Sequence, residues 1–306
     1  MQRKVFVCIP TYRESDKVRA LLESLRSVRY TPFEVIIINA NPGDLTSEII
    51  RQEQHLVNYM LHEEAGSSDQ YWSGTINRGL RRVLKCITGA DWVMLMNVDI
   101  TFNNDIVSML LEEAAKRPAC QIGALAHANG KVISSGVQVC SWAWTINRHL
   151  FAGFCIETVS QDVCVEVDFL PTRCLLFPGE ALIRAGFMQE TLLPHYGADY
   201  EFTRRLSQLG YKPYLYSKVR IQSDVTNTGQ CTFSKRASFL ERLCDIGSIK
   251  NPANLKYRIN FILSAYPKYA VLTAIFMYAL RTFLEVFLGG EILKYLLPTQ
   301  ERGFSK

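Results

Sequence analysis

The sequence predicts an α/β protein with a mostly parallel central sheet, helices on both faces of that sheet and an α-helical C-terminal extension. Apolar strand-like runs alternate with amphipathic helical segments over the first hundred residues. Parallel strands need such helical crossovers, so the alternation favours a parallel sheet. From residue 233 onward the pattern is helical. Hydrophobic residues make up 48% and charged residues 21% of the 306 residues, which excludes a disordered chain.

The first half of the chain contains four predicted strands, each a short apolar run. They are expected at 5–10, 33–38, 55–61 and 92–96, with helices starting near residue 15 and at 45–53 and 67–85. Ligands of such sheets bind at the carboxyl ends of the strands. Tyr12, Asn39 and Asp99 stand at three of these ends.

The second half is less regular. We expect helices at 105–116 and 197–210, and strand-like pieces at 121–126, 131–138, 163–168 and 213–216. The helix at 67–85 contains Gly74 and Gly79. Because glycine costs about 1 kcal/mol in a helix interior, two of them predict close approach by a neighbouring helix or a ligand.

Charge is distributed unevenly along the chain. Residues 234–306 hold 11 Lys/Arg and 5 Asp/Glu, whereas residues 1–233 hold 23 and 24. The near-neutral main body argues against a nucleic-acid partner. The nine cysteines contain no paired metal-ligand spacing, so we expect small buried side chains in a reducing compartment.

The C-terminal extension includes an apolar stretch at 270–290, about 31 Å long as a helix. Arg281 and Glu285 interrupt it, which disfavours a membrane-spanning helix. A helix lying in the plane of an anionic membrane and a helix packed on the body, or on a second copy, both stay open. The run at 5–10 is too short for a secretory leader, so we expect a cytoplasmic protein, peripheral on the inner face of the membrane if it binds lipid.

Two acidic positions are the main candidates for chemistry. Asp99 follows the buried strand at 92–96 in an Asn-Val-Asp stretch. A carboxylate at this place can bind a divalent cation that bridges phosphates, or it can simply form the turn after the strand. Asp199 follows Gly197 and opens a helix, as a base or as a helix-capping acid whose pKa the helix terminus would lower. In the same helix Glu201 is expected to pair with Arg205 on the surface.

These elements, taken in order, resemble glycosyltransferase family 2, the inverting sugar transferases of the GT-A fold, over roughly residues 4–230. The matching stretches are the turn at Pro10, Tyr12 and Arg13, the turn after Asn39, the Asn-Arg-Gly at 77–79, the Asn-Val-Asp at 97–99, and the Ala-Asp-Tyr-Glu-Phe at 198–202 followed by Arg204 or Arg205.

The resemblance implies a role for each matched residue. Asp199 would be the general base, and Asp99 would hold Mg²⁺ or Mn²⁺ on the diphosphate, with Asp224 as a further ligand. The nucleoside-diphosphate sugar would be contacted by Pro10, Tyr12, Arg13, Asn39, Asn77, Asn97 and Arg173. The alternative for Arg173 is a surface salt bridge.

The sequence departs from the family pattern in two places. The turn after the second strand reads Asn39-Ala40 where many relatives have an acid that reads the base, so uridine, thymidine and guanosine donors all stay open. The stretch at 219–229 lacks the histidine ligand of many relatives and offers only Asp224. His195 is a candidate for facing the acceptor, and Trp142 and Trp144 for stacking on it or packing in the core.

We therefore expect a nucleotide-sugar-binding half at 1–99, an acceptor-binding and catalytic half at 100–232, and an extension at 233–306 that serves as a membrane-surface or homodimer element. The expected activity is metal-dependent transfer of a sugar, rhamnose included, to a glycan or lipid-linked acceptor for surface polysaccharide. The alternatives are a non-catalytic glycan- or membrane-binding protein on the same fold and a sugar nucleotidyltransferase. The latter is disfavoured because the turn at 10–15 has no glycine.

Overall fold

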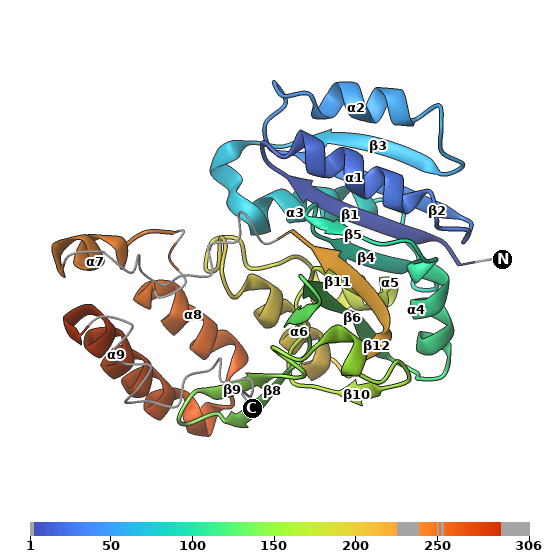
Figure 1. Ribbon diagram of the computed structural model, residues 1–306. Helices are drawn as coiled ribbons and strands as arrows, with labels where there is room; N and C mark the ends of the chain where they lie inside the picture. Colours follow the sequence, from blue (N-terminus) through green and yellow to red (C-terminus); the bar gives the residue numbers. More distant parts are fainter. Residues whose placement is uncertain (1–2, 225–238, 250, 252–253, 289–306) are drawn as a thin grey trace.

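The computed structural model describes residues 3–224, 239–249, 251 and 254–288, which form a sheet between two layers of helices (Figure 1). Within these residues the main sheet has ten strands, eight of them in the order β10-β12-β6-β11-β4-β1-β2-β3. A separate two-stranded hairpin, β8 (Val137–Ser141) with β9 (Ile146–His149), lies beside it. This α/β architecture with a helical extension is the predicted one.

The part of the sheet formed by residues 5–96, called the donor half after the role expected for it, is parallel, as predicted. Strand β1 (Val5–Thr11) runs between β2 (Phe33–Asn39) and β4 (Trp92–Met96), and β3 (Met60–Ala65) continues the sheet beyond β2. In the register of this half, Thr11 lies opposite Asn39. The carboxyl ends of these strands therefore meet at one edge.

The position of β3 corrects the sequence prediction. A strand was expected at 55–61, but β3 begins at Met60, and the chain before it turns around Leu56. The strand contains His62, Glu63 and Glu64. Polar residues are acceptable there because β3 is an edge strand that pairs only with β2.

The other half of the sheet brings in reversed strands. Strand β11 (Cys174–Pro178) is antiparallel both to β4 and to β6 (Cys120–Ala128), although no strand was predicted there. Strand β12 (Lys212–Ser223) is parallel to β6 and far longer than the predicted 213–216. Short strands complete the sheet: β5 (Ile100–Thr101), β7 (Lys131–Ser134) and β10 (Cys164–Glu166).

Two apolar cores lie on opposite faces of the sheet, because alternate residues of each strand point to opposite sides. One face is covered by α3 (Tyr71–Leu84), α5 (Gly179–Ala185) and α6 (Ala198–Gln208). The other is covered by α1 (Ser15–Leu25), α2 (Thr46–Glu53) and α4 (Ile106–Ala115).

The last two of the three C-terminal helices that the structure describes contribute to the first of these cores. The three are α7 (Phe239–Asp245), α8 (Leu255–Ala265) and α9 (Val271–Leu288). Phe261 and Ile262 of α8 and Tyr278 of α9 join the cluster that contains Phe202 of α6. Figure 1 shows the three helices gathered to one side of the sheet. In the part of the chain that the structure describes, no helix has the length and apolar character needed to cross a bilayer.

One of the two glycines of α3, Gly79, is explained by packing on the sheet. A Cβ atom at Gly79 would lie 2.6 Å from Ile38 Cδ1 and 3.3 Å from Cys8 Sγ. A Cβ at Gly74 would lie 3.0 Å from Gln70 Cβ of the preceding turn. Gly79 thus lets α3 approach β1 and β2 closely.

We expect Gly79→Ala to lower the free energy of unfolding by about 1–3 kcal/mol, because a methyl group would overpack this contact. Urea unfolding measures the loss. Gly43→Ala is the control, since a Cβ at Gly43 meets nothing within 4 Å. Equal stability of the two variants would contradict the close approach.

The cysteines are less uniformly buried than predicted. Cys8, Cys120 and Cys174 are buried, but Cys86, Cys140 and Cys155 are exposed. Their neighbours in sequence are polar or lie in loops, and no disulfide forms among the described cysteines.

Candidate active site

The turn after β1 brings Tyr12 to the surface of the site. Its side chain is 41% exposed, and the guanidinium of Arg13 lies 5.1 Å from the centre of its ring. Arg13 has a φ of +56°, a backbone conformation that non-glycine residues rarely adopt. Pro10 is buried within β1. Tyr12 and Arg13 are therefore accessible to a ligand, whereas Pro10 belongs to the buried strand that precedes the turn.

Asn39 lies under the turn that follows β2. It is fully buried, its Oδ1 accepts the N–H of Asn41 at 2.9 Å, and its Nδ2 donates to Glu63 Oε1 at 3.0 Å and Asp44 Oδ1 at 3.3 Å. Asn39 therefore fixes the shape of the turn rather than pointing out of it. Asp44, which the sequence analysis did not single out, has a buried Oδ2 without a hydrogen-bond partner.

Asp99 follows β4 and is bound by Arg173. Arg173 Nη1 lies 2.9 Å from Asp99 Oδ2 and 2.7 Å from Ser223 Oγ. Arg173 directly precedes β11. Because β11 runs antiparallel to β4, its first residue, Cys174, pairs with Met96 at the end of β4, and this brings Arg173 close to Asp99. The Asp99–Arg173 pair is largely buried, with side-chain exposures of 11% and 15%, so it is not the surface salt bridge considered as an alternative.

Asp224 is brought to the same place by β12. Its backbone N–H donates to the carbonyl of Asp99 at 2.8 Å, and its carboxylate lies 3.6 Å from Lys17 Nζ. The two acids proposed as metal ligands are thus neighbours, although 125 residues separate them in the sequence. Residues 225–229, where the sequence analysis sought a histidine, lie outside the described residues.

The donor atoms around Asp99 suit a hard divalent cation. Asn97 Oδ1 and Asp99 Oδ1 are both buried and have no hydrogen-bond partner. Mg²⁺ and similar ions take oxygen ligands, commonly one or two carboxylates completed by phosphates and water. Among the described residues no group of three or more His, Cys, Asp or Glu side chains could hold a metal alone. Asn97 and Asp99 therefore fit a metal whose remaining ligands come from the bound substrate. Arg173 occupies Oδ2 of Asp99, which leaves Oδ1 for the metal.

Asp199 lies in the first turn of α6, after Gly197 in the left-handed conformation. Its Oδ1 accepts the N–H of Tyr200 at 2.9 Å. Burial raises the pKa of Asp199 to about 6, although that N–H and the guanidinium groups of Arg173 and Arg258 pull the pKa the other way. A lowered pKa was expected from the helix terminus. That expectation is wrong because desolvation outweighs the helix.

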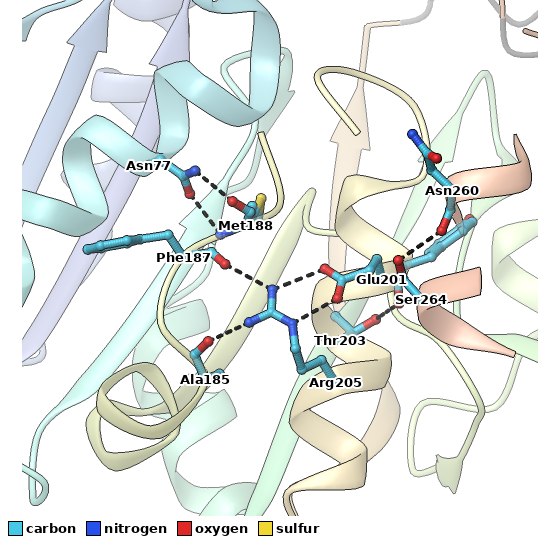
Figure 2. Close-up of polar contacts among 10 residues, drawn as sticks. Asn77, Ala185, Phe187, Met188, Glu201, Thr203, Arg205, Asn260 and Ser264 are labelled. Carbon is cyan, nitrogen blue, oxygen red and sulfur yellow. Dashed lines mark hydrogen bonds and ion pairs between the residues drawn. The ribbon is translucent and has the colours of Figure 1, made fainter. Parts of the chain in front are cut away.

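Glu201 and Arg205 form the predicted pair, but in the interior. Arg205 Nε lies 2.8 Å from Glu201 Oε1, and Glu201 is only 2% exposed. Arg205 also donates to the carbonyls of Ala185 and Phe187 (Figure 2). This identifies Arg205, rather than Arg204, as the arginine that fixes α6.

Asn77 faces the protein interior rather than open space. It is fully buried, and its side chain exchanges hydrogen bonds with the backbone of Met188 (Figure 2). Its Nδ2 also donates to Glu190 Oε2 at 2.6 Å. A direct contact with a nucleotide has no support from this location.

The aromatic candidates separate into two kinds. Trp142 packs edge-on against Phe169 and Tyr266, with ring centroids 5.6 Å and 4.9 Å away. Trp144 is 59% exposed at the turn between β8 and β9. His195 packs against the ring of Tyr196, 4.5 Å away.

Comparison with known proteins gives a family for the first part of the chain. Residues 6–150 match the family model described as glycosyl transferase family 2. This stretch is a glycosyltransferase family 2 domain. The family match covers the donor half and ends before β11, so Arg173 and Asp199 lie outside it.

Individual relatives are distant. A poly-beta-1,6-N-acetyl-D-glucosamine synthase of Staphylococcus aureus is 23% identical over 208 residues, 66% of this chain and 45% of the relative. The chain spans about half the length of the curated relatives it matches.

Solved structures share the GT-A fold. A mannosyltransferase of Pyrobaculum calidifontis, in complex with GDP-Man and Mn²⁺, aligns with a TM-score of 0.57 at 12% identity, over 95% of this chain and 76% of that one. S. aureus TarS 1–349 with UDP-GlcNAc aligns with a TM-score of 0.53 at 15% identity, over 92% and 91% of the two chains.

Proposed function

We propose that this family 2 protein is an inverting glycosyltransferase that moves a sugar from a nucleoside diphosphate to a hydroxyl of a glycan or lipid-linked acceptor in surface polysaccharide synthesis. One observation carries the proposal. Asp199 is a half-buried carboxylate with a raised pKa, and the charge of Arg173 acts on it. The same guanidinium binds Oδ2 of Asp99, whose other oxygen, Oδ1, has no hydrogen-bond partner. A candidate base and a candidate metal ligand that both feel the charge of Arg173 suit group transfer.

In the proposed reaction Asp199 accepts the proton of the acceptor hydroxyl, and the oxygen attacks the anomeric carbon from the face opposite the leaving group. The new glycosidic C–O bond forms as the bond to the diphosphate breaks, and its electron pair leaves with the nucleoside diphosphate. Arg173 can turn its fork of donors toward that phosphate charge. Bound at Asn97 and Asp99, Mg²⁺ or Mn²⁺ would neutralise more of it.

Base recognition is proposed for the exposed ring of Tyr12 and for the turn that Asn39 holds. Asp44 supplies a carboxylate to this turn and so substitutes for the acid that the pair Asn39-Ala40 lacks. The two aligned structures contain a guanosine and a uridine donor, so both nucleotides belong among the substrates to test.

The test is a panel of UDP-, GDP- and dTDP-sugars, dTDP-rhamnose included, with Mn²⁺ or Mg²⁺ and release of nucleoside diphosphate as the readout. Release that depends on an added acceptor supports the proposal. Tight nucleotide-sugar binding without release would favour the non-catalytic alternative. Release of pyrophosphate from a nucleoside triphosphate would favour a sugar nucleotidyltransferase.

We also propose that the protein works on the cytoplasmic face of a membrane through α9. One face of α9 packs on the body through Ala274, Tyr278, Thr282 and Val286. The other face exposes a stripe of apolar side chains, with exposures of 82%, 65%, 55% and 54% for Leu272, Phe276, Phe283 and Phe287. Lys256 and Lys268 are exposed nearby in the sequence, which favours an anionic lipid surface over a second copy of the chain that would bring the same lysines.

We expect the triple variant Leu272→Ser/Phe276→Ser/Phe283→Ser to bind anionic liposomes at least on the order of tenfold more weakly, since each buried side chain stabilises by roughly 1.5–3 kcal/mol. Liposome pelleting at low and high salt measures this. Leu56→Ser, at a site 64% exposed near α2, is the control. Unchanged pelleting, or loss of a dimer in light scattering, would indicate that the exposed face of α9 contacts protein rather than lipid.

A further inference from the structure

The loop between α5 and α6, residues 186–197, leads directly to Asp199. We call it the pre-α6 loop. Its last residue, Gly197, lies against the ring of Phe261 of α8, since a Cβ there would be 3.5 Å from Phe261 Cδ2. The position of Asp199 therefore depends on how this loop is held.

Helix α3 of the donor half holds the loop with two fully buried polar side chains. Asn77 Oδ1 accepts the N–H of Met188 at 2.9 Å, and its Nδ2 donates to the Met188 carbonyl at 2.9 Å (Figure 2). Ser73 Oγ lies 2.8 Å from the carbonyls of both Leu193 and Pro194, and its N–H donates to Pro194.

Two other helices hold the same segment from different sides. Arg205 of α6, already paired with Glu201, donates to the carbonyls of Ala185 and Phe187 (Figure 2). Asn260 of α8 donates to the carbonyl of Leu192 at 2.9 Å. The pre-α6 loop is thus fixed by side-chain donors of the donor half, the acceptor half and the extension.

We infer that Asn77 and Ser73 are positioning residues for the proposed base: by fixing the pre-α6 loop on α3, they keep the carboxylate of Asp199 in its half-buried place beside Arg173. Only the catalytic role of Asp199 rests on the proposed function. The geometric part concerns the surroundings of Asp199 and can be tested without turnover.

The groups that face Asp199 define what a released loop would change. They are the N–H of Tyr200 in its own helix, Arg173 from the strand side and Arg258 from α8. All three favour the carboxylate, and only burial opposes it. If the loop loosens and water enters, the pKa of Asp199 falls toward its ordinary value of 3.8.

The experiment compares Asn77→Ser and Ser73→Ala with the parent protein. In each background, the carboxyl band of Asp199 is recorded against pH as the infrared difference spectrum between the protein with Asp199 and its Asp199→Asn form, which reports the titration of Asp199 without any substrate. We expect a midpoint near pH 6 in the parent and a midpoint at least about one unit lower in both variants. Where an active donor is known, the acidic limb of kcat should move by the same amount.

Gln121→Ala is the matched control. Gln121 is also fully buried and donates to two carbonyls, those of Thr203 and Tyr211, but does not contact the pre-α6 loop. Its midpoint should stay at the parent value even though stability falls. An unchanged midpoint in the α3 variants, or an equal shift in Gln121→Ala, would overturn the inference. Ser73→Ala keeps the test valid if Asn77→Ser does not fold, because it removes only the hydroxyl contacts to the carbonyls of Leu193 and Pro194.

Discussion

Asp199→Asn is expected to abolish sugar transfer while making the folded protein more stable at neutral pH. A general base contributes roughly 10²- to 10⁴-fold to a rate, and asparagine cannot accept the acceptor's proton. The amide keeps the acceptor oxygen for the N–H of Tyr200. It removes a charge that the folded protein disfavours, because burial raises the pKa of Asp199 to about 6.

The sign of the stability effect follows from that shift. Between the ordinary pKa of 3.8 and about 6, the folded state retains a proton that the unfolded chain releases, so the parent loses stability as pH rises through this window. Asp199→Asn escapes the loss. It should gain up to about 3 kcal/mol above pH 6 and nothing below pH 4.

Urea unfolding at pH 4 and pH 7.5 measures the gain, and nucleoside diphosphate release measures the activity. A variant that is less stable than the parent at pH 7.5 would show that Asp199 is stabilised as an ion. Retained activity would remove Asp199 from its proposed role.

Asp99→Asn is expected to have the second large effect, on activity and stability together. Loss of the carboxylate removes the proposed metal ligand, which should lower the rate on the order of 10²-fold or more and weaken Mn²⁺ binding. It also removes the carboxylate that pairs with the largely buried guanidinium of Arg173. We expect a loss of about 1–3 kcal/mol in unfolding free energy.

The double variant Asp99→Asn/Arg173→Gln separates the two effects. Removing the cation together with its acid should recover most of the stability but none of the activity. Arg173→Gln alone should bind Mn²⁺ more tightly, since the ion then competes with no guanidinium for Asp99. Lys212→Gln, which breaks an exposed pair with Glu166, controls for loss of a charge and should cost less than about 1 kcal/mol. Calorimetric Mn²⁺ titration that is equal for Arg173→Gln and the parent would contradict the competition.

The donor half could be predicted well from the sequence because its signals are local. Strands β1, β2 and β4 are continuous apolar runs buried on both faces, and the polar residues that follow them meet at one edge by the rule for parallel sheets. The positions of Tyr12 and Asp99 follow from that rule.

The features that escaped prediction depend on tertiary contacts. Nothing local marks the five residues of β11 as the strand that joins the two halves of the sheet. Asn77 sits in a stretch typical of a ligand-binding helix, yet its partners are 111 and 113 residues away. The pKa of Asp199 was predicted in the wrong direction because helix position is readable from sequence and desolvation is not.

The reversed direction of β11 has a consequence for how this protein can diverge. Residues 6–150, the stretch that carries the family signature, contain Asn97 and Asp99, whereas Arg173 arrives from outside that stretch. With Asp99 in its proposed role as a metal ligand, substitutions just before β11 would change how strongly the site binds a metal while the signature stays intact. Two relatives with identical donor motifs can differ in metal requirement, and the residue aligned with Arg173 is the position to compare between them.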